Sequence, residues 1–258
     1  CRHIGRTGPC VDALIEAGIR RVIFAQTDPN PEAAHGAAEL AETGVDVEGG
    51  VLADQAAAIN VEWAQAVTQQ RPFVTLKIAA TLDGRIAAAD GSSRWITGPK
   101  SRNFVHQLRA EADAVLVGTG TVLADDPELT DRRPQANYQP RPVVLGRREI
   151  PSDRRLAQNP QTLRLRTRSV ADALSELFDE GIRHVLVEGG PTVATAFIAS
   201  GYVDRLLWFT APKLLGRGQV AVGDLGIETI DAALAWKTVD ITQFGGDVCF
   251  TLTPQRSE

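Results

Sequence analysis

The sequence predicts an α/β protein whose main domain contains a largely parallel β-sheet. Short runs of Val, Ile and Leu alternate with longer segments of helical spacing, which is typical of strands joined by crossover helices. Glycines follow several of the expected helices and prolines begin others, as helix ends favour. Hydrophobic residues make up 43% of the chain and charged residues 23%, a composition typical of a soluble globular protein.

The first 70 residues are expected to form a small unit of their own. Helices are predicted over residues 9–17, 32–42 and 54–67, a buried strand over 21–25, and a short strand or loop over 45–51. The polar stretch 68–72 ends in a proline and marks a domain boundary between residues 70 and 71.

A second pattern of strands and helices begins at residue 73. Strands are predicted over residues 73–79, 114–117, 142–145, 184–187, 205–210 and 248–253, and helices over 99–110, 169–180 and 191–200. The stretch 125–141 is long, polar and proline-rich, which indicates a functional loop. Cys249 is expected in the core, and His35, His106 and His184 at the surface or at helix caps.

Charge and segment composition exclude several classes of protein. The net charge of −5 argues against a general nucleic-acid binder, so the arginine-rich stretch 147–168 is interpreted as a solvated face. No apolar run is long enough for a membrane span, and the given residues contain no secretory signal, although a lost N-terminus could have carried one. Three cysteines do not make a disulfide framework. A cytoplasmic enzyme that binds neither nucleic acid nor membrane is therefore expected.

Two cysteines at the start of the chain form a candidate zinc site. Cys1 and Cys10 bracket a glycine-rich turn, and Cys10 lies at the start of the first expected helix, where the thiolate that binds zinc is favoured. Two ordinary thiols remain the alternative, because the C-x8-C spacing is not that of a zinc ribbon. The chain contains no methionine at all, so we expect that an upstream segment was lost, cleaved or omitted.

Residues 1–10 and the Asp-Pro-Asn-Pro turn at 28–31 resemble the deaminase half of the bifunctional deaminase/reductase family of riboflavin biosynthesis. In that family the two cysteines bind zinc with a histidine from an upstream His-x-Glu segment, whose glutamate shuttles protons. This chain lacks that segment, and Ile4 and Gly8 depart from the family pattern. The resemblance implies a partial cytidine-deaminase-like α/β/α domain over residues 1–70, an incomplete zinc site and no deaminase turnover.

A longer resemblance, to the reductase half of the same family, covers residues 73 to about 253. Its blocks are residues 77–87, 93–97, 108–110, 113–118, 121–130, 187–192 and 211–216. It implies that residues 71–258 form a dihydrofolate-reductase-like mixed sheet flanked by helices, with NADPH as cofactor. A homodimer or larger homo-oligomer is also implied.

The Gly189-Gly190 pair, between an expected strand and helix, allows a phosphate to approach the backbone, although such a pair is also a common tight turn. By resemblance, the NADPH-contacting positions are Ala79, Trp95, Thr121, Asp125, Gly190, Pro191, Thr192, Val193, Ala194, Thr195 and Ala196.

The implied reaction is reduction of the ribosyl group of 5-amino-6-(5-phosphoribosylamino)uracil, a small phosphoribosyl-pyrimidine, to ribityl. Arginines suit its phosphate, and the resemblance implies substrate contacts at Ser93, Arg109, Leu129, Arg132 and Glu188.

Negative charge must be stabilised as the hydride is transferred, and Lys77 is the expected electrophile. Asp125 would position the sugar or relay a proton; the alternative is a lysine–aspartate surface pair. Two further interpretations stay open, a stand-alone reductase that acts before deamination and a non-catalytic paralogue.

Overall fold

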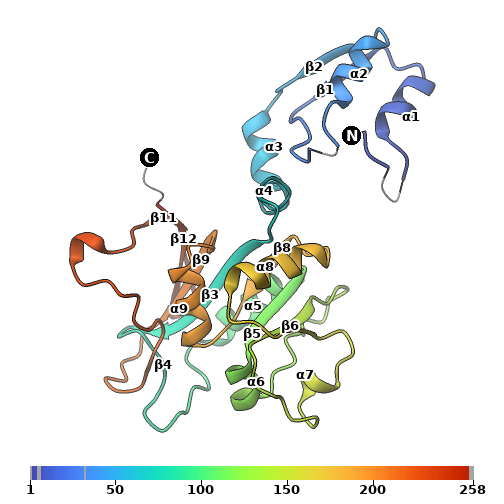
Figure 1. Cartoon of the computed structure of the whole chain (residues 1–258). Coiled ribbons are helices and arrows are strands. Elements are labelled where there is room, and N and C mark those ends of the chain that lie inside the picture. Colours follow the sequence, from blue (N-terminus) through green and yellow to red (C-terminus); the bar gives the residue numbers. More distant parts are fainter. Residues whose placement is uncertain (1, 5–6, 32, 256–258) are drawn as a thin grey trace. The chain divides into compact units, whose positions relative to one another are not determined.

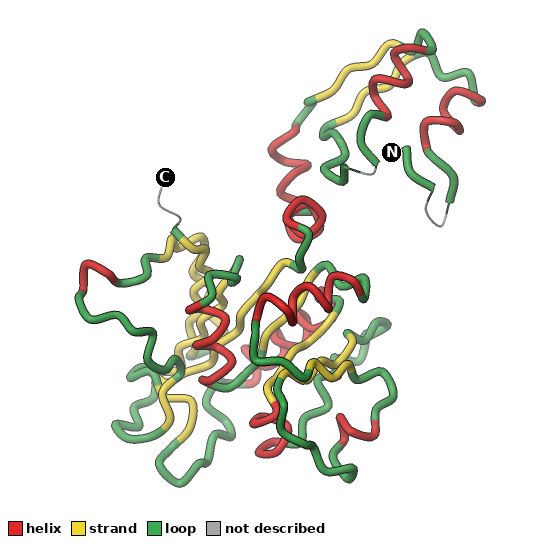
Figure 2. Tube along the Cα trace, in the orientation of Figure 1, coloured by secondary structure: helices red, strands yellow, loops and turns green. Residues whose placement is uncertain are grey.

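The computed structural model describes residues 2–4, 7–31 and 33–255 (Figures 1 and 2). Its chain forms two compact units, Cys1–Pro72 and Phe73–Glu258. No helix within the described ranges has the length and apolar character needed to cross a bilayer.

The first unit has a two-stranded parallel sheet, in which β1 (Arg21–Phe24) pairs with β2 (Asp46–Gly49). Its helices are α1 (Cys10–Glu16), α2 (Gly36–Glu42), α3 (Ala53–Ile59) and α4 (Val61–Gln69). The single helix expected over 54–67 is wrong, because the helix is interrupted at Asn60, where φ is −122°. The expectation of a buried β1 is also wrong, since Ile23 is 55% exposed. Residue 32, the expected start of a helix, lies outside the described residues.

The second unit is built on an eight-stranded sheet with the order β11-β12-β9-β3-β8-β5-β6-β7. The strands from β9 to β7 run parallel, whereas β12 is antiparallel to both β9 and β11, so the sheet is mixed. Its strands are β3 (Phe73–Thr81), β5 (Ala114–Gly118), β6 (Arg141–Leu145), β7 (Leu163–Leu165), β8 (His184–Val187), β9 (Arg205–Ala211), β11 (Trp236–Phe244) and β12 (Asp247–Pro254). A small antiparallel pair joins β4 (Arg85–Ala87) to β10 (Gln219–Val220).

Helices cover both faces of this sheet. On one face, α8 (Val170–Asp179) and α9 (Pro191–Ala199) pack against inward residues such as Val74, Leu76 and Val187 (Figure 1). The other face is covered by α5 (Pro99–Glu111), α6 (Thr119–Asp125) and α7 (Arg155–Gln158), with short η1 (Ile230–Ala232) elsewhere in the unit. Because side chains alternate along a strand, odd-numbered residues of β3 such as Lys77 and Ala79 face the α5 side.

The predicted strands and helices of the second unit are confirmed, with ends that differ by one or two residues. Cys249 is buried, as predicted, at 2% exposure. The structure adds α6, α7, β4, β7, β10 and β11, which the sequence pattern did not predict. β11 was missed because it is an edge strand whose seven central residues are all exposed, and its alternation of apolar and polar residues is confined to the short run 238–242.

Gly218 is required by the close approach of two chain segments. Its φ is +142°, and a Cβ at this position would lie 2.0 Å from the carbonyl oxygen of Ala87 in β4. We expect Gly218→Ala to lower the free energy of unfolding by at least about 3 kcal/mol, because the β4–β10 contact must separate. Gly216→Ala is the matched control, since its φ is +67° with nothing within 4 Å. Urea unfolding should show that Gly216→Ala lowers the free energy of unfolding by only about 1–2 kcal/mol. Equal losses in both variants would show that glycine is not specifically required at residue 218.

Candidate active site

The register of the sheet places two charged side chains next to each other. Leu76 of β3 pairs with Val187 of β8, so the next pair brings Lys77 beside Glu188. Both side chains face the α5 side, where Arg109, in the last turn of α5, meets them. Glu188 follows the carboxyl end of β8, and ligands of open α/β sheets bind at such ends. These three residues form the charged cluster of the site.

The charged cluster is largely withdrawn from solvent. Arg109 donates from Nε to Glu188 Oε1 at 2.7 Å and from Nη2 to Oε2 at 3.1 Å, a bidentate pair. Lys77 Nζ lies 3.9 Å from Glu188 Oε2. The side chains of Lys77, Glu188 and Arg109 are 19%, 9% and 14% exposed. Two cations share one carboxylate, so the cluster carries excess positive charge that favours an anionic ligand.

The three groups shift one another's protonation. Burial lowers the pKa of Lys77; the Glu188 carboxylate opposes this, and the Arg109 guanidinium adds to the lowering. Burial alone would raise the pKa of Glu188, but Arg109 and Lys77 together hold it below its ordinary value. Glu188 therefore stays ionised, and Lys77 gives up its proton more readily than an exposed lysine. Such a pair is suited to proton transfer.

A carboxylate of β12, a strand distant in sequence, fixes the start of α5. Asp247 of β12 accepts from the Gly98 amide at 2.7 Å and from the Ser101 hydroxyl at 2.5 Å. Its side chain thus supplies the cap that the helix sequence itself lacks. Fixing α5 at this end sets the position of Arg109 at the other.

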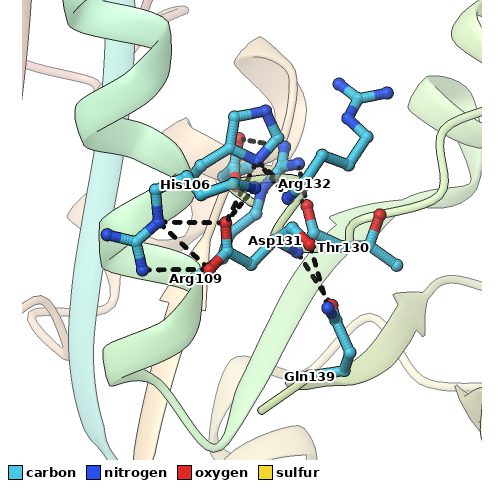
Figure 3. Close-up of polar contacts among 8 residues, drawn as sticks. His106, Arg109, Thr130, Asp131, Arg132 and Gln139 are labelled. Carbon is cyan, nitrogen blue, oxygen red and sulfur yellow. Dashed lines mark hydrogen bonds and ion pairs between the residues drawn. The ribbon is translucent and has the colours of Figure 1, made fainter. Parts of the chain in front are cut away.

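The loop after α6 is held against α5 by side chains (Figure 3). Thr130 O accepts from Arg109 Nη1 at 3.0 Å, and the Arg132 amide donates to His106 Nδ1 at 3.2 Å. Gln139 binds both the amide and the carbonyl of Asp131, each at 2.9 Å. These contacts tie the backbone of three consecutive loop residues to the protein.

Leu129 and Arg132, both in this loop, differ in their exposure to solvent. Leu129 is 3% exposed with a φ of +60°, so a leucine is held in the left-handed region by the packing around it. Arg132 is exposed, and Figure 3 shows its guanidinium directed away from the other side chains. Within the described part of the chain its guanidinium has no ion pair. Of the two arginines expected to bind phosphate, Arg132 therefore has open donors, whereas Arg109 uses Nε, Nη1 and Nη2 within the protein.

Two helix starts meet beside the charged cluster. Gly190 precedes α9, whose first turn has no side-chain cap, and a Cβ on Gly190 would lie 3.7 Å from Thr121 Oγ1 of α6. A Cβ on Gly118, just before α6, would lie 2.7 Å from Val193 Cγ2. The glycines therefore allow close packing here, and the structure brings together Thr121, Gly190 and Val193, which the sequence assigns to cofactor binding.

The other predicted cofactor and substrate positions are spread along the same edge or lie in the core. Trp95 is 59% exposed, with the Arg102 guanidinium 4.5 Å from its ring centroid. Asp125 is 44% exposed and approaches Arg94, not Lys77, so a Lys77–Asp125 pair is not formed. Ser93 is partly buried, as are Ala79 and Ala196, whereas Thr192 is exposed after Pro191. Ala194 is 1% exposed in the core, and Thr195 accepts from the Gly223 amide at 2.7 Å.

The candidate zinc residues are only partly described. Cys1 lies outside the described residues, and Cys10 is exposed at the start of α1. Among the residues that the structure does describe, no three His, Cys, Asp or Glu side chains come together as a metal site.

The prediction that His106 lies at the surface or at a helix cap is wrong. Its side chain is 17% exposed and contacts the loop through Nδ1, so it is neither a surface nor a cap residue. His184 is also partly buried, with Nε2 2.9 Å from Thr75 Oγ1, whereas His35 does precede α2. The spacing carried a signal for His106, because residues three apart on a helix share a face and Arg109 was already a candidate. Asp131, Arg133 and Gln139 had no such signal.

Comparison with known proteins gives the family of the chain. The RibD C-terminal domain family matches residues 72–250. The riboflavin biosynthesis protein RibD of Mycobacterium tuberculosis is 46% identical over 257 residues, covering 98% of this chain and 75% of that protein. The Escherichia coli protein of the same name is 36% identical, covering 98% and 79%.

The chain belongs to the RibD family. The structure of Acinetobacter baumannii RibD aligns with a TM-score of 0.91 at 34% identity, over 99% of this chain and 79% of that one. A Thermotoga maritima structure aligns with a TM-score of 0.87 at 33% identity over 99% and 77%; its name is diaminohydroxyphosphoribosylaminopyrimidine deaminase/5-amino-6-(5-phosphoribosylamino)uracil reductase. The α/β fold with a large mixed sheet flanked by helices is thus that of the RibD reductase domain, an oxidoreductase domain of riboflavin biosynthesis.

Proposed function

We propose that this chain is an NADPH-dependent reductase that converts the ribosyl group of 5-amino-6-(5-phosphoribosylamino)uracil to ribityl. The observation that carries the proposal is the buried charged cluster of Lys77, Glu188 and Arg109 at the carboxyl edge of a RibD reductase sheet. An exposed arginine, Arg132, follows on the loop that Arg109 holds. A cationic cluster with a buried lysine at this edge of the sheet suits an anionic sugar phosphate that must be reduced.

The residues at the start of α9 fit a dinucleotide cofactor. In the described chain the amides of Gly190 and Thr192 donate to no backbone carbonyl, and no side chain caps the helix. Free amides at a helix start bind phosphate groups, and glycine leaves room for the pyrophosphate. We propose that residues 190–193, with Thr121, Trp95 and Ala79, hold NADPH, which supplies the hydride when bound.

The chain's own residues would provide the rest of the chemistry. The reduction adds a hydride to the ribosyl carbon attached to the amine and breaks the bond from that carbon to the ring oxygen, which then needs a proton. Lys77 places a positive charge and a proton donor in a site largely withdrawn from water, where both act strongly. Glu188 orients Lys77, and Asp125 and Ser93 would position the sugar.

We propose that the substrate's phosphate binds chiefly to Arg132. Its guanidinium is exposed and has no ion pair in the described chain, whereas three nitrogens of Arg109 already contact Glu188 and Thr130. The role of Arg109 would then be to stabilise the ionised Glu188 and to add positive charge.

For the first unit we propose a relationship without an activity. Residues 1–70 would be the C-terminal part of a zinc deaminase domain and residues 71–258 the reductase. The described residues do not fit a complete zinc site, so no deamination step is assigned to them. We also propose a cytoplasmic homodimer or larger homo-oligomer, on the resemblance alone.

Oxidation of NADPH, followed by absorbance, tests the proposed activity. The deaminated aminouracil substrate is expected to support turnover, and the diaminopyrimidine that still carries the second amine is expected to be much poorer. Equal or greater turnover with the aminated compound would favour a stand-alone reductase acting before deamination. No turnover with either compound would overturn the proposal in favour of a non-catalytic paralogue.

A further inference from the structure

His106 contacts the loop next to the proposed phosphate-binding arginine. It lies on α5 three residues before Arg109, so both side chains point from the same helix face. His106 Nδ1 is 3.2 Å from the Arg132 amide nitrogen and 3.1 Å from the Thr130 carbonyl oxygen. The two side chains thus bind neighbouring residues of the loop, because Arg109 also donates to Thr130 O.

We infer that His106 is a positioning residue of the reductase site: its neutral imidazole holds the backbone amide of Arg132 and so directs the Arg132 guanidinium toward the substrate's phosphate. The inference rests on the proposed function, which makes Arg132 a phosphate ligand. It extends that function, because His106 itself would touch neither substrate nor cofactor.

Among the described residues, the other side chains that contact the loop do not bind the backbone amide of Arg132. Gln139 clamps the amide and carbonyl of Asp131, and Arg133 binds the fully buried Asp131 carboxylate through Nε and Nη2. The Arg133 backbone amide also donates to Asp131 Oδ1 at 3.0 Å, so these bonds fix the loop on both sides of residue 132 but do not bind the Arg132 amide itself. The described structure gives the Arg132 backbone amide one hydrogen-bond acceptor, and that acceptor is His106 Nδ1.

The hydrogen bond requires the neutral ring with its hydrogen on Nε2, so that Nδ1 accepts. A backbone N–H donates only to an unprotonated ring nitrogen, and a protonated Nδ1 is itself a donor. A protonated Nδ1 would instead donate to Thr130 O, which is already 3.1 Å away and can accept a second hydrogen bond beside that from Arg109, or would face Asp131 Oδ1 at 3.9 Å. The Arg132 amide would lose its acceptor in either case.

The surroundings of the ring favour the neutral form. Burial lowers the pKa of His106 from its ordinary 6.5, and the nearby Arg109 and Arg132 guanidinium groups lower it further. The Thr130 carbonyl and the Asp131 carboxylate act in the opposite direction. The Glu188 carboxylate also interacts electrostatically with the ring. The net lowering keeps the imidazole neutral at pH 7, where the bond to Arg132 is intact.

Two substitutions at one position separate positioning from packing. His106→Asn retains an acceptor, since the asparagine amide oxygen stands near the place of Nδ1 and cannot be protonated. His106→Ala removes the acceptor. We expect His106→Ala to raise KM for the phosphorylated substrate about tenfold, the loss of roughly one hydrogen bond's effect, with kcat changed by less than about twofold. His106→Asn should keep KM within about twofold of the unsubstituted protein.

A substrate without phosphate is the matched control. The corresponding dephosphorylated riboside cannot use Arg132, so its KM should be the same for both variants and the unsubstituted protein. A KM rise in His106→Ala that is equal for the two substrates, or a KM in His106→Asn as high as in His106→Ala, would overturn the inference. Thermal unfolding of all three proteins identifies a variant that fails to fold, and if His106→Ala does, the pH dependence of KM in His106→Asn still tests the inference.

Direct binding keeps this test independent of turnover. Calorimetric titration with ribose 5-phosphate should show binding to the unsubstituted protein, about tenfold weaker binding to His106→Ala and near-normal binding to His106→Asn. If NADPH oxidation fails but this pattern appears, the proposed reaction is wrong while the positioning role stands. If oxidation proceeds but all three proteins bind ribose 5-phosphate alike, the positioning role is wrong.

The pH dependence gives a readout that a structural role would not change. Because the pKa of His106 is lowered from its ordinary 6.5, the ring takes up a proton only as the pH falls below that lowered value, and KM for the phosphorylated substrate should rise there. The substrate's phosphate also loses charge near pH 6, which raises KM in every variant. His106→Asn should therefore show a shallower rise than the unsubstituted protein, and profiles of equal steepness would contradict the role of ring protonation.

Discussion

Replacing Lys77 by methionine is expected to lower kcat about 10²- to 10³-fold, the usual effect of removing one group that stabilises charge in a transition state. Methionine keeps the unbranched chain but removes the charge that lies 3.9 Å from Glu188. The Kd for NADPH, from fluorescence titration, should stay nearly unchanged, because Lys77 is not among the residues proposed to hold the cofactor. Turnover equal to that of the unsubstituted protein would refute the electrophilic role of Lys77.

Lys100→Met is the matched control for this substitution. Lys100 lies in the first turn of α5 and is exposed. Its replacement makes the same change in composition and net charge, away from the charged cluster. We expect kcat and KM to remain within about twofold, so a large loss in both variants would indicate a general effect of charge.

Breaking the Arg109–Glu188 pair is expected to have the largest effect on stability. Glu188→Gln leaves Arg109 and Lys77 buried with no ionised partner, and loss of one member of a buried ion pair costs about 3–5 kcal/mol. Urea unfolding should show this loss, and reductase turnover should fall with it.

A double substitution tests whether the loss comes from unpaired charge. Arg109→Leu with Glu188→Leu removes both ions, and replacing a buried pair by apolar side chains is often neutral for stability. The double variant is therefore expected to be more stable than Glu188→Gln while remaining inactive. A double variant less stable than either single one would show that the pair stabilises the fold beyond its own charges.

Much of the site could be predicted because its residues lie on regular elements. Lys77 lies on a nine-residue strand with a strong apolar pattern, and Glu188 directly follows another. Alternation along β3 predicts which face Lys77 takes. Arg109 was assigned to a helix whose start at Pro99 was correctly predicted.

The loop contacts could not be predicted, because they depend on long-range geometry. Leu129 adopts a positive φ that no local preference of leucine favours. Asp247 accepts from the amide of Gly98, at the start of α5, which lies 149 residues earlier in the chain. Gln139 binds Asp131, eight residues before it. His106 was assigned to the surface because the sequence does not show that this loop folds over its face of α5.

The edge of the sheet was missed for a different physical reason. The apolar residues of β12 predict a strand, whereas β11 lies at the exposed edge and has only the short alternation at 238–242; its pairing with β12 is what shows it to be a strand. The predicted mixed, largely parallel sheet is confirmed: the strands from β9 to β7 run parallel, and β12, which makes the sheet mixed, lies beyond them.

Transfer of deuterium tests the central claim most directly. The protein would be incubated with the deaminated aminouracil substrate and NADPH deuterated at the transferred position, and the product examined by mass spectrometry and NMR. The account predicts one deuterium on the ribityl carbon bonded to the amine, at a rate that falls with Lys77→Met. Consumption of the cofactor with no deuterium in a ribityl product would contradict it.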